Sequence, residues 1–373
     1  MRLDFDADQL AVREAIAAAL KGASGDRIRE IWGRGFLDTE YRALGQMGMF
    51  GFAAGEPVDS PGGGQVEACL LAEQLGLHAA VSPVLACVVQ AAGALRPHPR
   101  FAEQYGRLVA AEAVWTWAHL EAATRPDRPP ALRAVPDGGG LVLTGEKAFV
   151  EWGTRAERFV VTATADGEPL VVVAAADAAG VTAAPRQTST GGEIARVAFD
   201  RTPVAAADVL ARGDAAVRLI AATWRRTLLF QSAYLVGLGR RALDLTIAHA
   251  TVREQFGRPL GAFQAVKHAL ADSHIALLAA RLLVFETASG TALRTPVAAL
   301  AAMKAWVAEA TTQALRVAHE IHGGLGAVDD HEVTLLFRRA LAESQLHGSA
   351  SQLWELAAQA RADIGAGTRR PPH

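Results

Sequence analysis

Residues 253–264 carry the side chains whose types and spacing point most directly to chemistry. They read REQFGRPLGAFQ, so Arg253 precedes the aromatic residue Phe256, and the stretch closes on the amide of Gln264. An arginine at a helix end binds phosphate through a planar fork of N–H donors, and a phenylalanine three residues later can cover a flat ring system. Gln255 belongs to the same predicted site. The stretch predicts binding of a ligand that combines phosphate with a ring.

A glycine cluster follows about 60 residues later. Residues 319–326 read HEIHGGLG, and such a cluster alone most often marks a helix cap or a turn. Its histidines, His319 and His322, together with His331, raise the alternative of a metal site. A His-x-x-His pair without a set of carboxylate or thiol partners is weak evidence for one, so the sequence predicts no metal.

Two long helices must position the first stretch. Residues 215–250 are dense in Ala, Leu, Ile and Val and contain no proline, which predicts one long buried helix. Pro259, between Gly257 and Gly261, ends that pattern because proline cannot continue a helix and glycine relaxes the backbone. A second long helical pattern then covers residues 262–288.

The whole chain divides into three regions with different patterns. Residues 1–112 are predicted to form an N-terminal helical domain, 113–210 a middle β-domain, and 211–373 a C-terminal four-helix bundle with a solvated tail. Short β-branched runs separated by glycine turns indicate a small β-barrel or sandwich in the middle region. These runs lie at 141–144, 159–162, 170–173 and 196–199. The predicted fold class is therefore mainly α with a central β-domain.

Composition excludes several classes of protein. The 373 residues are 51% hydrophobic and 20% charged, which is typical of a globular enzyme, and a net charge of −2 offers no basic surface for nucleic acid. No run of about 18 uninterrupted apolar residues predicts a membrane span, and no signal peptide is visible. Cys69 and Cys87 stand in apolar helical surroundings and are predicted to be buried free thiols. We expect a cytoplasmic protein.

The two motifs together resemble those of the acyl-CoA dehydrogenase superfamily, in a divergent form common in actinobacteria. Residues 253–264 resemble its Arg-x-x-Phe-Gly-x-x-x-x-x-Phe-Gln helix turn, and residues 319–326 resemble its Gln-x-x-Gly-Gly-x-Gly segment, in the same order and at the same distance. Residues 145–153 (GEKAFVEWG) resemble the strand whose aromatic residue lies against the flavin. Segments 44–51 and 73–76 resemble parts of the family's N-terminal domain, where the glycines are expected to form tight turns.

The resemblance implies a flavoenzyme that acts on the CH–CH bond of an acyl thioester. FAD is the implied cofactor, and the substrate would be an acyl-CoA or a carrier-bound acyl group. The family's helix turn reaches the flavin held by a neighbouring subunit, which implies a homo- or hetero-tetramer. The implied cofactor-binding residues are Arg253, Gln255, Phe256, Gln264, Glu320, Gly323, Gly324, Phe149 and Gln352.

The family's chemistry needs a carboxylate that removes the α-proton while the β-hydrogen leaves as hydride. Members place this base at one of two positions, and the matching residues here are Gly348 and Thr227. Glycine takes no proton, and a threonine hydroxyl is far too weak a base. The family's Thr-Glu-Pro loop is also replaced, by the stretch around His119-Leu120-Glu121. The catalytic base is therefore unknown from the sequence.

Four residues could substitute for the missing base. His347 adjoins Gly348 and a histidine can accept a proton near neutral pH, although a hydrogen-bonded structural histidine is the commoner role. Asp330 and Glu332 are most simply helix N-terminal charges. Glu343 lies five residues before Gly348 and so off the same helical face.

Two functions remain open. One is a flavoenzyme of the acyl-CoA dehydrogenase type, and the other is a non-catalytic subunit that completes the flavin site of a base-bearing paralogue. Retention of Arg253, Phe256 and Gln264 beside two missing bases is the pattern that the second function predicts. A scaffold without flavin would leave these three residues unexplained.

Overall fold

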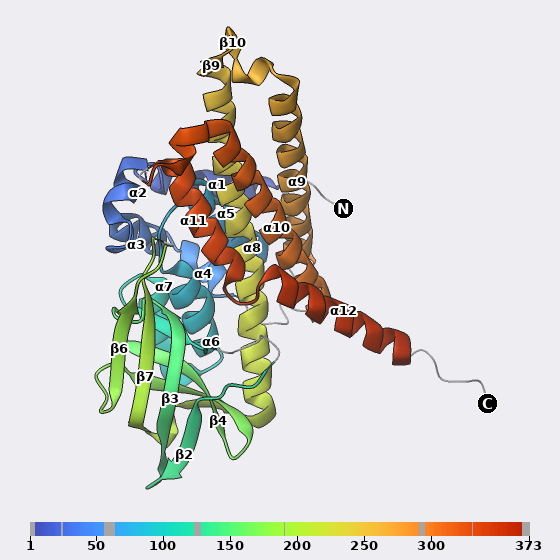
Figure 1. The fold of residues 1–373 in the computed structure, drawn as a ribbon. Coiled ribbons are helices and arrows are strands. Elements are labelled where there is room, and N and C mark those ends of the chain that lie inside the picture. Colours follow the sequence, from blue (N-terminus) through green and yellow to red (C-terminus); the bar gives the residue numbers. More distant parts are fainter. Residues whose placement is uncertain are drawn as a thin grey trace, which may run out of the picture.

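The computed structural model describes residues 4–23, 25–55, 64–122, 128–189, 191–290, 295–329 and 331–367. The first part of the chain is helical, as predicted, and packs beside the middle of a long helix bundle (Figure 1). Its elements are α1 (Ala7–Ala19), α2 (Gly25–Ile31), α3 (Asp38–Gln46), α4 (Met49–Ala53), α5 (Gln65–Leu77), the π-helix η1 (Val84–Ala92), α6 (Gly93–Leu95), the 3₁₀ turn η2 (Pro99–Phe101) and α7 (Ala102–Val109).

Local sequence accounts for where these helices begin and what they bury. Asp6 caps α1: its carboxylate accepts the N–H of Gln9 at 2.9 Å, and the Gln9 side chain accepts the N–H of Asp6 at 3.2 Å. The π-helix η1 is buried along its whole length, because its sequence VLACVVQAA is apolar except for Gln90. Cys69 and Cys87 are buried free thiols, as predicted.

One of the glycines expected to form turns has another role. Gly48 does form a turn, with φ +76° before α4. Gly76, however, lies inside α5 at its crossing with α8 (Gly213–Val252), opposite Gly237. A Cβ on Gly76 would stand 2.2 Å from the carbonyl oxygen of Tyr234, so only glycine lets the two backbones approach this closely.

The middle region forms one mixed eight-stranded sheet. Seven strands follow the order β6-β7-β3-β2-β4-β5-β8, and β1 pairs in parallel with β4. The bounds are β1 (Trp115–Ala118), β2 (Arg133–Asp137), β3 (Gly140–Glu151), β4 (Arg158–Ala165), β5 (Glu168–Ala175), β6 (Val181–Arg186), β7 (Ile194–Val204), the 3₁₀ turn η3 (Ala206–Asp208) and β8 (Val209–Arg212). All four predicted β-branched runs lie in these strands.

Strand β4 is buried on both faces. Val160 belongs to the large helical core, whereas Phe159 and Val161 belong to a separate core inside the sheet domain. Alternate residues of a strand point to opposite faces, so an uninterrupted apolar run joins the sheet to the helices. This contact places β1 against η1 and β5 against α8.

The C-terminal region is helical again, and the predicted fold class is confirmed. Helix α8 runs the length of the molecule, from the sheet to a short hairpin at the far end (Figure 1). The remaining elements are β9 (Glu254–Gln255), β10 (Arg258–Pro259), the 3₁₀ turn η4 (Leu260–Ala262), α9 (Gln264–Ser289), α10 (Val297–His322), the 3₁₀ turn η5 (Gly323–Ala327), α11 (Glu332–Gln345) and α12 (Ala350–Gly367).

Helix α9 leaves much of its apolar surface uncovered in this chain. It is long and apolar enough to pass as a membrane span by length and composition, and 22% of that apolar window is buried. A helix packed in a bundle passes the same test. Ile275 is 64% exposed and Leu278 45% exposed, so this outer face is apolar.

Candidate functional site

The predicted cofactor residues lie in two groups. The first group surrounds the β9–β10 hairpin, which Arg253 enters as the residue directly after α8. Phe256 stands at its tip with φ +54° and a side chain that is 92% exposed. The guanidinium of Arg258 lies 4.1 Å from the ring centre of Phe263, which fixes the turn into α9. Arg253, Gln255 and Gln264 are exposed beside it.

The glycine segment belongs to this first group. The ring of His249, one turn before the end of α8, stacks on the ring of His322 with centres 4.3 Å apart. Gly323 then ends α10 with φ +58°, and Glu320, Gly323 and Gly324 are all exposed. Nδ1 of His322 lies 2.7 Å from the carbonyl oxygen of Ala318, so it donates there.

These histidines have structural partners. Nδ1 of His319 lies 3.1 Å from the carbonyl oxygen of Leu315, and Nδ1 of His331 accepts the N–H of Val333 at the start of α11. Within the part of the chain that the structure describes, no group of three or more metal-binding side chains occurs. The ring contacts of His249 with His322 and of His322 with His331 join the ends of α8, α10 and α11.

The second group lies at the other end of the bundle, against the sheet. Here a pocket of about 350 Å³ opens between the end of β3, the loop after β1 and the turn before α12. Phe149, His347, Gly348 and Gln352 line it, and so does Trp224 from α8. The indole N–H of Trp224 donates to the carbonyl oxygen of His347 at 3.0 Å, which holds this turn on α8.

Gln90 contacts both Thr227 and His347, the residue next to Gly348. Its amide Nε2 donates to Oγ1 of Thr227 at 3.0 Å and lies 3.3 Å from Nε2 of His347. The Thr227 hydroxyl in turn donates to the carbonyl oxygen of Thr223 at 2.9 Å. The sequence could have indicated Gln90, since it is the one polar residue in the buried run of η1.

His347 is a poor base in this setting. Burial lowers its pKa to about 3, and the nearby His119 and Lys304 lower it in the same direction. At neutral pH the ring is unprotonated, yet it holds a proton too weakly to take one from a carbon acid. Gly348 has no side chain and φ +123°. Among the described residues at the usual base positions, the structure offers no carboxylate.

The other candidate acids are engaged elsewhere. Glu343 is 3% exposed, and its carboxylate lies 3.0 Å from Arg339 and accepts the amide of Gln231 at 2.8 Å. Glu332 lies in the first turn of α11 and pairs with Arg241 at 2.7 Å, which fits its predicted role as a helix N-terminal charge. Asp330 lies outside the described residues.

The loop that replaces the family's Thr-Glu-Pro segment still borders the pocket. His119 and Glu121 line it directly after β1. The ammonium of Lys147, fully buried on β3, lies 2.5 Å from the carboxylate of Glu121 and 3.3 Å from the carbonyl oxygen of His119. Burial lowers the pKa of Lys147 to about 8, while Glu121 opposes the shift. This ion pair, which the sequence did not indicate, fixes the loop against the sheet.

The two groups are far apart in one chain. From Trp224 at the pocket to Arg253 at the hairpin, α8 advances by 29 residues, or about 44 Å at 1.5 Å per residue. Figure 1 shows the hairpin and the sheet at opposite ends of the molecule. The structure therefore brings Arg253 together with the glycine segment, and Phe149 with His347, but does not join these two groups.

The chain is similar in sequence to proteins of a known family. A family model described as acyl-CoA dehydrogenase, C-terminal domain, matches residues 220–361. Acyl-CoA dehydrogenase FadE27 of Mycobacterium tuberculosis is 31% identical over 341 residues, covering 87% of this chain and 86% of its own length. The chain belongs to the acyl-CoA dehydrogenase family. The resemblance read from the two motifs is thus confirmed.

Two solved structures of acyl-CoA dehydrogenase type match over nearly the full length. A chain of the ChsE4-ChsE5 complex from Mycobacterium tuberculosis superposes with a TM-score of 0.88 at 26% identity, and the match covers 100% of this chain and 100% of that one. A variant of the Tcur3481-Tcur3483 steroid ACAD gives a TM-score of 0.86 at 26% identity, covering 96% of this chain and 99% of its own. Each of the two structures is named for a pair of proteins.

Proposed function

We propose that this chain is a subunit of an FAD-dependent acyl-CoA dehydrogenase assembly in which each flavin lies between two subunits. The observation that carries the proposal is the separation of about 44 Å between Trp224 and Arg253 along α8. A single flavin cofactor cannot span both groups within one chain. A neighbouring subunit that brings its hairpin to the pocket of this one would complete the site.

The residues of the two groups suit different ends of FAD. Arg253 and Gln264 supply exposed N–H donors for a pyrophosphate, and the side chain of Phe256, 92% exposed, has a large surface for a partner to cover. Phe149 and Gln352 offer a ring and an amide at the pocket. Glu320 is exposed and negative, so it suits a place beside the phosphates rather than on them.

When bound, FAD would supply the acceptor for the hydride that leaves the acyl thioester. This chain's own residues would bind and orient the flavin and the substrate. Phe149 would cover one face of the flavin ring, and the Lys147–Glu121 ion pair would hold the loop after β1 in place at the pocket. The hydrogen bond from Gln90 would keep the imidazole of His347 uncharged. None of these groups removes an α-proton.

We propose further that a base-bearing paralogue supplies the missing carboxylate in a mixed tetramer. The absence of an acid at Gly348 and Thr227, both within the described residues, supports this choice, and so does the low pKa of His347. The apolar outer face of α9, with Ile275 and Leu278 exposed, suits burial against another subunit. One solved structure that this chain resembles is itself a complex, that of ChsE4 with ChsE5.

Coexpression with a paralogue that carries the base tests the proposal. The purified complex should contain FAD, and Arg253→Ala should weaken flavin retention by about 1.5–3 kcal/mol, because a charge-assisted phosphate contact is lost. Arg258→Ala is the matched control, since that guanidinium stacks on Phe263 in the same hairpin. A colourless complex that takes up no FAD would contradict the cofactor, and equal loss in both variants would contradict the role of Arg253.

A self-sufficient homo-oligomer is the second candidate. The pocket of about 350 Å³ beside Phe149 favours it, because an open pocket remains at the expected reaction point. Turnover of an acyl-CoA by the purified chain alone, with an artificial electron acceptor, would support this candidate. Turnover only after addition of the paralogue would support the mixed assembly.

A further inference from the structure

Three histidine rings from three helix ends lie against one another beside η5. His249 is in the last turn of α8, His322 ends α10, and His331 directly precedes α11. The rings of His249 and His322 are stacked with centres 4.3 Å apart, and the ring centres of His322 and His331 are 5.2 Å apart. Two protonated imidazoles at these distances would repel each other, so this arrangement favours neutral rings.

His331 also has a role that requires its neutral form. Its Nδ1 accepts the N–H of Val333 at 3.3 Å and so caps the first turn of α11. A protonated imidazole carries a hydrogen on each nitrogen and can accept none. Protonation would leave the N–H of the fully buried Val333 without this acceptor. It would also put a positive charge at a helix N-terminus, where the helix dipole disfavours it.

The capped turn of α11 is tied to η5. The hydroxyl of Thr334 donates to the carbonyl oxygen of Gly326 at 2.6 Å. Gly326 in turn lies against the end of α10, since an added Cβ would stand 3.0 Å from the carbonyl oxygen of His319 and 3.4 Å from Cβ of His322. Loss of the cap at His331 would therefore loosen the contact that holds η5 in place.

The surroundings of the rings favour their neutral forms as well. Burial lowers the pKa of both His249 and His331, and the ring of His322 is the next cause for each. The other basic groups that lower these pKa values come from α2, from the end of α8 and from α10, and are Arg29, Arg253 and His319. Glu332 opposes the shift at His331, but its carboxylate is shared with Arg241 at 2.7 Å.

Acid should therefore open this end of the bundle. A histidine whose pKa is lowered in the closed form binds its proton more tightly once the contact opens. The closed form is fully stable above about pH 7 and loses stability as the pH falls below about 6.5, the ordinary pKa of a free histidine. Each proton taken up on opening favours the open form by up to about tenfold per pH unit.

We propose that His249, His322 and His331 form a pH-sensitive switch that holds η5 closed at neutral pH and releases it in mild acid. The switch itself needs no flavin. One consequence rests on the proposed function: Gly323 and Gly324 belong to the group that would lie at the phosphates of FAD, so opening of η5 would weaken flavin binding.

Hydrogen exchange of the purified protein without added FAD tests the switch directly. The amides of Val333, Thr334 and Leu335 report the first turn of α11, because the first bonds to the side chain of His331 and the other two to its carbonyl oxygen. Their protection factors, each taken relative to the intrinsic exchange rate at the same pH, should fall about tenfold between pH 6.5 and 5.5.

Three variants show which group titrates. His331→Ser keeps an oxygen that accepts the N–H of Val333 but does not titrate in this range, so its protection factors should stay constant. His249→Phe keeps a ring against His322 without a charge and should reduce the fall. His268→Gln, at an exposed position of α9, is the matched control and should follow wild type.

Two results would overturn the switch. One is a set of wild-type protection factors that does not change between pH 6.5 and 5.5. The other is an equal fall in wild type, His331→Ser and His249→Phe, because the titrating group would then lie elsewhere. If His331→Ser does not fold, His249→Phe decides the matter, since it retains the cap at His331.

FAD titration of the complex with a paralogue separates the switch from the proposed function. The Kd of FAD, measured from the fluorescence of the free flavin, should rise about tenfold from pH 6.5 to 5.5 in wild type and stay constant in His331→Ser. An equal rise in both proteins would contradict control of the flavin by the switch. Protection factors that fall while the Kd stays constant would confirm the switch and contradict the placing of the FAD phosphates at Gly323 and Gly324.

Discussion

Gln90 contacts His347, which lines the pocket, with the amide Nε2 of Gln90 3.3 Å from Nε2 of His347. An amide nitrogen carries two hydrogens, so Gln90 can donate one to His347 and the other to the hydroxyl of Thr227. The hydroxyl hydrogen then goes to the carbonyl oxygen of Thr223. Every donor finds an acceptor only while the imidazole is neutral, which agrees with the lowered pKa of His347.

A carboxylate placed at Thr227 should restore a base. Thr227→Glu keeps a helical position and brings its acid beside the amide of Gln90, which can donate to it. We expect the flavin-loaded assembly with Thr227→Glu to oxidise an acyl-CoA faster than wild type by about 10²- to 10⁴-fold, the usual contribution of a positioned base. An artificial electron acceptor reports the rate.

Gly348→Glu should restore less, although it is the commoner base position. Gly348 has φ +123°, which strains any other residue by about 1–3 kcal/mol. Urea unfolding should show that loss. Thr227→Gln has the shape of Thr227→Glu without its charge, so equal rates for the two would show that the carboxylate does nothing.

The stability of the protein should fall steeply as the pH falls below about 6.5. Burial lowers the folded-state pKa of both His119 and His347 to about 3, so the unfolded chain takes up these protons first as the pH drops. Each histidine then removes about 1.4 kcal/mol of stability per pH unit between its unfolded and folded pKa.

Replacing one of these histidines should therefore flatten the pH profile. The free energy of unfolding of His347→Gln, measured in urea between pH 7 and 4, should decline less steeply than that of wild type by about 1.4 kcal/mol per pH unit. His268→Gln at an exposed position of α9 is the control and should follow wild type. Identical slopes for all three would mean that His347 is not buried in its neutral form.

Sequence pattern predicted the fold better than the site, for a physical reason. Pro259 with two glycines, or a β-branched run such as Leu170–Val173, acts on its own backbone, so the hairpin and the strand can be read locally. Gly76 could not be read this way. Its role depends on Tyr234 and Gly237, which lie about 160 residues further along the chain.

The pocket depended on the same kind of distant contact. Phe149 and Gln352 were found because they stand in motifs of the family. Gln90 and Lys147 lie within apolar or strand segments, and their roles arise from partners on other elements, Thr227 for the first and Glu121 for the second. Only the folded chain shows that Gln90 contacts His347 and that Lys147 contacts Glu121, two residues that line one pocket.

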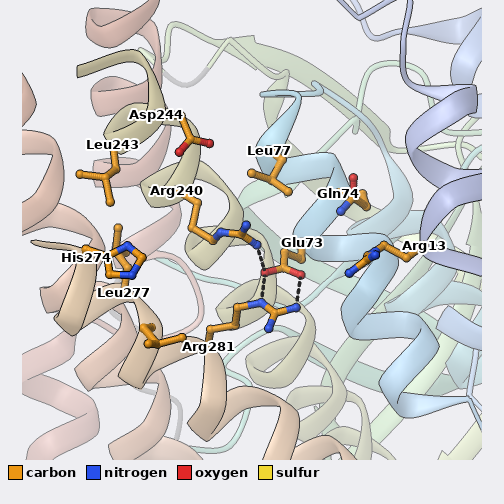
Figure 2. Close-up of a pocket in the computed structure, with 11 residues that line it drawn as sticks. Arg13, Glu73, Gln74, Leu77, Arg240, Leu243, Asp244, His274, Leu277 and Arg281 are labelled. Atoms are coloured by element: carbon orange, nitrogen blue, oxygen red, sulfur yellow. Dashed lines mark hydrogen bonds and ion pairs between the residues drawn. The ribbon is translucent and has the colours of Figure 1, made fainter. Parts of the chain in front are cut away.

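Glu73 should matter to stability because it joins three helices. Its carboxylate, with a side chain 1% exposed, lies 2.8 Å from Arg240 on α8 and 2.6 Å from Arg281 on α9 (Figure 2). Glu73→Gln would leave the two guanidinium groups facing each other. Both still reach water, at 39% and 19% exposure, so we expect a loss of about 2 kcal/mol, below the usual cost for a fully buried pair.

The measurement for Glu73 is urea unfolding with a surface pair as reference. Glu157→Gln removes the partner of Arg107, where the distance is 3.4 Å and both side chains are more than 40% exposed. It should change stability little, because exposed pairs are weak. If Glu73→Gln costs no more than Glu157→Gln, the cluster in Figure 2 does not hold α5 to the bundle.

The crossing of α5 and α8 gives the sharpest test of the packing, since two glycine-to-alanine changes should have opposite signs. A Cβ on Gly237 would lie 2.2 Å from the carbonyl oxygen of Glu73 and 2.8 Å from Cα of Gly76, so the helices would have to separate. Gly237→Ala should cost about 3 kcal/mol or more, as overpacking against backbone does. Gly106, inside α7, has no described atom within 4 Å of an added Cβ. Gly106→Ala should therefore stabilise the protein by about 0.5–1 kcal/mol through helix propensity. Urea unfolding of both variants decides the matter: if Gly237→Ala is as stable as Gly106→Ala, the helices do not cross as closely as described.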